Sequence, residues 1–144
     1  MVSNTAIATF RQIIIAVFDK LASDDASNVG YDSNDICQLP SGKDAFDLFQ
    51  DLCALSNEEP STFLKIKDFP KDYGMELLEA ILSQHHVLIK NHAQLFQFVQ
   101  DKISTLLIKS FTEKLDYSKS VKIMRLSLAF VGHFHDKLVR FSYN

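Results

Sequence analysis

The chain has 144 residues and a mass of 16.4 kDa, and 47% of its residues are hydrophobic, which suits one domain with a buried core. Four glycines and three prolines are too few for the turns of a many-stranded all-β fold. The net charge of −3 and a pI near 5.9 argue against a nucleic-acid-binding protein.

A first helix is predicted over 5–22, because its apolar residues recur at steps of three and four that place them on one face. These residues are Phe10, Ile14, Val17, Phe18 and Leu21. The segment 23–40 is rich in Ser, Asp, Asn and Gly, a composition that cannot offset the entropy cost of ordering. We therefore expect a mobile acidic loop over 23–40.

A second helix is predicted from Ser41 to about residue 55. Ser41 is the expected N-cap, and Asp44 three residues later favours the positive end of the helix. The connection that follows, 56–71, contains apolar residues that we expect to fix it to the core. A third helix is predicted over 72–83, and residues 85–90 either extend it or form a separate turn.

A fourth helix is predicted over 91–111, with Asn91 as its cap and Phe111 at the far end of its buried face. A fifth helix begins at Asp116 or Ser118. The face that it is expected to bury consists of Val121, Met124, Leu128, Val131, Phe134 and Leu138.

These elements predict an all-α fold of armadillo or HEAT type, a helical solenoid fragment of about five to six helices. The whole chain, 1–144, is expected to form a single helical domain and to be a fragment of a larger protein. No internal repeat is evident in the sequence, so this prediction depends on the helical pattern alone.

The sequence offers little that would support catalysis or metal binding. His133 and His135 would point about 200° apart around a helix, so a zinc site would need ligands from elsewhere in the fold. The carboxylates of Glu76 and Glu79 share one helix face, which is more typical of a solvated surface than of an acid–base pair. Cys37 and Cys53 indicate a reduced intracellular protein. We predict no enzyme activity and no cofactor.

Two surfaces are candidates for binding a partner. Residues 1–99 carry 14 acidic and 7 basic side chains, whereas residues 100–144 carry 4 acidic and 8 basic ones. The basic end could contact an acidic partner or anionic lipid, or could simply be a set of solvated helix faces. Its residues are Lys102, Lys109, Lys114, Lys119, Lys122, Arg125, Lys137 and Arg140. A possible self-association face consists of Phe10, Ile14, Phe130 and Phe141.

Several segments, taken in order, resemble one protein family. Residues 44–53 and 73–82 are similar to the N-terminal signature of the large Golgi Arf exchange factors of Sec7 type. Residues 105–111 and 123–126 resemble later segments of the same region. The similarity is strongest to the Mon-two/Ysl-two branch, which lacks the catalytic Sec7 domain. The chain would then contain the later part of the dimerisation/cyclophilin-binding (DCB) region and the start of the homology-upstream-of-Sec7 (HUS) region.

The resemblance implies a non-catalytic adaptor in vesicle traffic between Golgi and endosome, peripheral on trans-Golgi and endosomal membranes and otherwise cytoplasmic. It implies contact with a second copy or the rest of its own chain, with a Dopey-type scaffold and with an Arf-like small GTPase. It supplies no catalytic residue. The alternative is a membrane-surface module that binds anionic lipid through the basic C-terminal half.

Overall fold

The computed structural model describes residues 4–27, 40–62, 71–114 and 116–143. Within these residues the fold is all-α and contains six helices and no strand. The predicted fold class is confirmed. None of the described helices is both long and apolar enough to cross a lipid bilayer.

The five long helices follow the predicted order, and a short sixth helix lies between the third and the fourth of them. Their bounds are α1 Asn4–Ser27, α2 Pro40–Ser56, α3 Lys71–Gln84, α4 His86–Asn91, α5 Ala93–Thr112 and α6 Tyr117–Tyr143. The separate turn that was one of the two alternatives for residues 85–90 is therefore α4.

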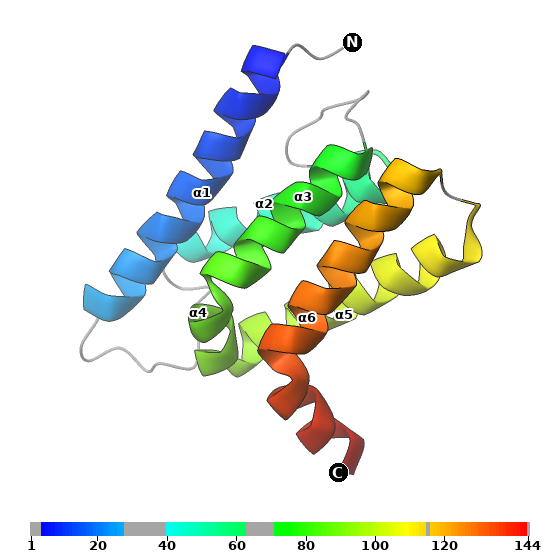
Figure 1. Cartoon of the computed structure of the whole chain (residues 1–144). Coiled ribbons are helices and arrows are strands. Elements are labelled where there is room, and N and C mark those ends of the chain that lie inside the picture. The colour runs from blue at the N-terminus through cyan, green and yellow to red at the C-terminus, as the bar shows by residue number, and fades with distance from the viewer. Residues whose placement is uncertain (1–3, 28–39, 63–70, 115, 144) are drawn as a thin grey trace.

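The helices form two layers (Figure 1). Helices α1, α3 and α6 lie on one side, and α2 and α5 lie behind them. The two consecutive pairs, α2–α3 and α5–α6, pack side by side, because α3 contacts α6 and α2 contacts α5. Such stacking of helical pairs is the arrangement expected of a solenoid fragment.

Three predicted helix boundaries differ from those of the structure, by between one and five residues. The helix α1 continues through 23–27, which belonged to the predicted loop, and residues 28–39 lie outside the described part of the chain. Ser41 is a buried residue inside α2, and its hydroxyl donates a hydrogen bond of 2.8 Å to Asp24 Oδ2 of α1. Asn91 ends α4, and the N-cap position of α5 is His92.

The start of α6 follows the prediction. Asp116 precedes the helix, and its Oδ1 accepts a hydrogen bond of 2.8 Å from the backbone N–H of Lys119. This is the usual geometry of an acidic N-cap.

The core lies between the two layers and draws on all six helices. Its largest fully buried side chains are Phe18, Phe49, Phe134, Ile14, Leu21, Leu52, Met75, Leu78, Leu82, Ile89 and Leu95. Phenylalanine rings contribute directly, with Phe96 and Phe130 each packing on Phe134 at centroid distances of 5.9 and 5.8 Å.

The predicted buried face of the last helix is wrong. The side chains of α6 that enter the core are Ile123, Leu126, Phe130 and Phe134. Of the predicted set, Phe134 is buried and Val121 is half-buried, whereas Met124, Leu128 and Val131 are exposed; the side chain of Leu138 lies outside the described residues. Phe111 of α5, also predicted to be buried, is 64% exposed.

The α2–α3 contact contains a buried hydroxyl that we expect to be destabilising. Ser56 Oγ is buried and has no hydrogen-bond partner among the described residues, and a Cβ added to Gly74 would lie 2.2 Å from it. Ser56→Ala is therefore expected to raise the free energy of unfolding by about 1 kcal/mol. Urea denaturation of the variant measures this change.

The same contact makes the effect of Gly74→Ala depend on residue 56. Alone, the new methyl group meets the hydroxyl, whereas in the Ser56→Ala background it gains helix propensity of up to about 1 kcal/mol. A double-mutant cycle should therefore show Gly74→Ala to be more favourable in that background. Equal effects in both backgrounds would contradict this packing.

Candidate protein-interaction surface

An uncharged apolar row lies on the outer face of α6. It consists of Tyr117, Val121, Met124, Leu128 and Val131, and we call it the α6 stripe. Tyr117 is 87% exposed and Leu128 is 70% exposed. The residues are spaced by alternating steps of four and three, the period with which one helix presents a seam to another.

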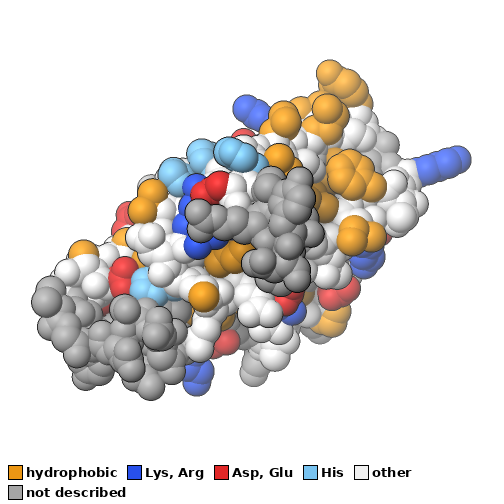
Figure 2. All heavy atoms as spheres, turned by 90° about the horizontal axis from the view of Figure 1, so that it is seen from below, with side chains coloured by type: hydrophobic (Ala, Val, Ile, Leu, Met, Phe, Trp, Pro, Cys, Tyr) orange, Lys and Arg blue, Asp and Glu red, His pale blue; other side chains and the backbone are white. Residues whose placement is uncertain are grey.

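Further apolar side chains are exposed where α5 leads into α6. Ile108 and Phe111 are 68% and 64% exposed. Figure 2 shows hydrophobic side chains gathered at the end of the molecule formed by α5 and α6. An exposed apolar patch of this kind is typical of a surface that another protein or another helix covers.

The rotation of α6 that exposes the stripe is the one that buries Ile123, Leu126, Phe130 and Phe134, and two ion pairs with α3 accompany it. Lys122 Nζ contacts Glu76 Oε1, and Arg125 Nε lies 3.9 Å from Glu79 Oε1. Residues 122 and 125 are therefore on the side of α6 toward α3, and Ile123 and Leu126 enter the core beside them. Sequence reasoning missed the stripe because it assigned four of its five residues, Val121, Met124, Leu128 and Val131, to the core.

Two of the four residues predicted to form a self-association face are buried in this fold. Ile14 is 0% and Phe130 is 4% exposed, because both side chains lie in the core between the layers. Phe10 is half-buried and packs against the same core. The side chain of Phe141 lies outside the described residues.

The predicted basic residues do not form one free face. In addition to the two pairs with α3, Lys109 Nζ donates a hydrogen bond of 3.0 Å to the carbonyl oxygen of Asn57 and lies 3.6 Å from Glu59 Oε1. Lys102 Nζ lies 5.8 Å from the centre of the Phe98 ring. Of the remaining residues, Lys114 is exposed, and Lys119 and Lys137 are half-buried. The side chain of Arg140 lies outside the described residues.

Two histidine–aspartate contacts attach α1 to the region around α4. His85 Nε2 lies 3.2 Å from Asp19 Oδ1, and His92 Nε2 lies 2.9 Å from Asp25 Oδ1. Burial lowers the pKa of His85, although Asp19 acts in the opposite direction. The uncharged imidazole is therefore favoured, and we assign it a packing role beneath α1, where it lies 5.7 Å from the Phe18 ring.

The fold also brings together two histidines that the sequence could not relate. His86 of α4 and His133 of α6 stack at a centroid distance of 4.4 Å. Burial and the neighbouring His133 and Lys90 lower the pKa of His86. Within the described residues, no group of three His, Cys, Asp or Glu side chains could hold a metal ion.

Comparison with known proteins identifies the family. A family model described as "Mon2/Sec7/BIG1-like, HUS domain" matches residues 41–141, which contain α2 to α5 and most of α6. The chain is 30% identical to "Protein MON2 homolog" of Homo sapiens over 128 residues, which cover 80% of this chain. It is 33% identical over 138 residues, or 93% of this chain, to the protein of the same name in Schizosaccharomyces pombe.

"Protein MON2" of Saccharomyces cerevisiae is 27% identical over 138 residues and 87% of this chain. The matched region is 8% of the length of each of these three relatives. No solved structure matches the chain. The predicted resemblance is confirmed, because the family model covers more than half of the chain and the relatives carry the name of the predicted branch. The chain therefore belongs to the Mon2/Sec7/BIG1-like HUS domain family.

Proposed function

We propose that this chain is a non-catalytic scaffold segment in Golgi-to-endosome vesicle trafficking, and that it acts by helix-to-helix contact through the α6 stripe. The family supports the trafficking role, because the matched model is a HUS domain and the relatives are named as MON2 proteins. The observation that carries the contact is the exposure of Met124, Leu128 and Val131 in a row on one helix.

The partner that best fits the stripe is a second copy of this chain. The stripe contains no charged residue, so two copies can face each other without repulsion between like charges. An antiparallel pair whose two-fold axis passes between residues 127 and 128 would place Met124 of one copy against Val131 of the other, as an isologous interface requires. The steps of four and three residues in the stripe are the spacing found where two helices pack with their axes at a shallow angle.

Gly132 supports a close approach at this surface. It lies inside α6 and is exposed, and a Cβ added there would meet no atom of the described residues within 4 Å. Glycine inside a helix costs about 0.5–1 kcal/mol relative to alanine. Packing within the described chain does not require this glycine, whereas a second helix crossing near Val131 would benefit from the space it leaves.

The finer parts of the proposal come from the family. We propose a Dopey-type scaffold and an Arf-like small GTPase as further partners, and a cytoplasmic location on trans-Golgi and endosomal membranes. The alternative, a lipid-binding module, is less well supported. Lys109, Lys122 and Arg125 already face acidic side chains of the same chain, which reduces their attraction for anionic headgroups.

Light scattering across a dilution series tests the proposed contact. The chain of 16.4 kDa is expected to form a dimer of twice that mass, and Leu128→Glu is expected to shift it to monomer, since it places two carboxylates at the centre of the interface. The matched control is Val87→Glu, because Val87 is a 59% exposed aliphatic residue on α4. It should leave the dimer intact.

Two results would contradict self-association through the stripe. One is a wild-type mass that stays at 16.4 kDa at every concentration. In that case the stripe would bind a helix of a different protein. The other is a dimer that dissociates equally in the two variants, or in neither of them. Circular dichroism of both variants verifies that they remain folded.

A further inference from the structure

A groove follows α3 between α1 and α6. Its first part is a cavity of about 250 Å³ between α1 and α3, lined by Ile7, Ala8, Arg11, Tyr73, Glu76 and Leu77. A second cavity of about 360 Å³ shares Arg11 and Glu76 with the first and continues to Arg125 of α6. The two cavities therefore form one surface, separate from the α6 stripe.

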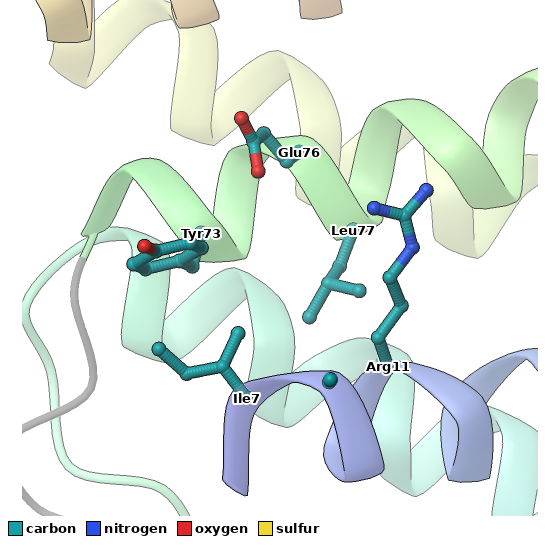
Figure 3. A pocket seen from close by; sticks show the side chains of 6 residues that line it. Ile7, Arg11, Tyr73, Glu76 and Leu77 are labelled. Carbon is teal, nitrogen blue, oxygen red and sulfur yellow. The ribbon is translucent and has the colours of Figure 1, made fainter. Parts of the chain in front are cut away.

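The first cavity has an apolar base and a charged rim (Figure 3). Ile7 of α1 and Tyr73 of α3 face each other across it, and the side chain of Leu77 points from α3 toward α1. The side chain of Arg11 extends from α1 toward α3 beside Leu77. A ligand side chain that enters between the helices would contact carbon atoms and would lie next to this guanidinium.

The charges along the groove differ in whether they have a partner. Glu76 contacts Lys122, and Glu79 lies 3.9 Å from Arg125, so both carboxylates face cations of the same chain. Arg11 is exposed and makes no ion pair with any residue that the structure describes. Arg11 is thus a cation without an ion pair among the described residues, beside an apolar cavity, and this combination favours a partner that has a carboxylate next to an apolar side chain.

We propose that this groove binds an acidic amphipathic helix of a partner protein. The helix would place an apolar side chain among Ile7, Tyr73 and Leu77 and would direct a carboxylate to Arg11. The walls formed by α1 and α6 and the floor formed by α3 correspond to the helix-in-groove mode of peptide recognition. The proposal extends the scaffold function proposed above, and it depends on that function for the class of its partner.

A designed peptide tests the proposed recognition. The probe is a fluorescein-labelled helical peptide of about 16 residues, with leucines along one face and glutamates beside them. Two control peptides replace the glutamates by lysines or the leucines by serines. We expect fluorescence anisotropy to show tighter binding of the acidic leucine peptide than of either control. NMR should place the chemical-shift changes at Ile7, Tyr73 and Leu77.

Charge reversal at Arg11 provides the decisive variant. Arg11→Glu is expected to weaken binding of the acidic peptide by about tenfold and to favour the lysine peptide instead. Lys20→Glu makes the same change in net charge on α1, at a residue that does not line the groove and whose side chain is 68% exposed. It should leave the affinity unchanged.

The possible outcomes separate this proposal from the dimer. Equal binding of the acidic and lysine peptides, absence of binding, or shifts confined to the α6 stripe would each overturn the groove assignment. Leu128→Glu should remove self-association without affecting the peptide, whereas Arg11→Glu should weaken peptide binding without affecting the dimer. Each variant thus reports on one surface.

Discussion

Leu126→Ala is expected to lower the free energy of unfolding by about 2–5 kcal/mol, whereas Leu128→Ala should change it by less than about 0.5 kcal/mol. The two leucines lie two positions apart on α6, but Leu126 is 0% exposed and Leu128 is 70% exposed. The first truncation leaves a cavity between α6 and α3, and the second removes a side chain that already contacts water.

Urea denaturation followed by circular dichroism measures both changes. It should be carried out at a concentration at which the chain is monomeric, because dimerisation through Leu128 would add to the apparent stability. A larger loss for Leu128→Ala than for Leu126→Ala would show that the helix is rotated as the sequence pattern predicts. The pair therefore tests the orientation of α6 directly.

This orientation is the point at which the sequence pattern was insufficient. The helix α6 has two apolar rows, one at 123, 126, 130 and 134 and one at 117, 121, 124, 128 and 131, and both satisfy helical periodicity. Periodicity shows that such rows exist, but not which of them meets the core. The contacts of Lys122 and Arg125 with α3 link residues 46 positions apart in the chain, and no local pattern predicts them.

The helices themselves could be predicted because their signals are local. Each long helix was identified from apolar residues at three- and four-residue steps, and α4 was one of two stated alternatives for its segment. The caps were less predictable. Ser41 has the residue type and position of an N-cap, but the neighbouring Asp24 of α1 accepts its hydrogen bond. Tertiary contacts of this kind override a local preference.

The surfaces were predicted less well than the fold. Burial of Ile14 and Phe130 follows from how three or more helices meet, so an aromatic or aliphatic residue gives no sign of whether it will face a partner or the core. Arg11 and Tyr73 are 62 positions apart in the sequence, and the groove between them exists only because α1 and α3 lie side by side. Charge counts indicated a basic end but not which cations already have acidic partners.

The thiol of Cys53 is expected to react at least a thousandfold more slowly in the native chain than in the unfolded one. Its side chain is buried, and burial raises its pKa to about 12, with Lys102 acting in the opposite direction. Only the thiolate reacts, and at pH 8 a thiol with this pKa is ionised to about 0.01%, compared with roughly a quarter for an ordinary cysteine. Steric protection in the core slows the reaction further.

A coloured disulfide reagent, used on a Cys37→Ser variant so that Cys53 is the one thiol in the sequence, measures this rate with and without urea. Because modification requires the core to open, Leu126→Ala should accelerate labelling by the factor by which it raises the equilibrium constant for opening, and Leu128→Ala should not. Rapid native labelling in all three proteins would place Cys53 outside the core. Rapid labelling confined to Leu126→Ala would show that the packing of α6 on α3 controls the opening of the layer that contains α2.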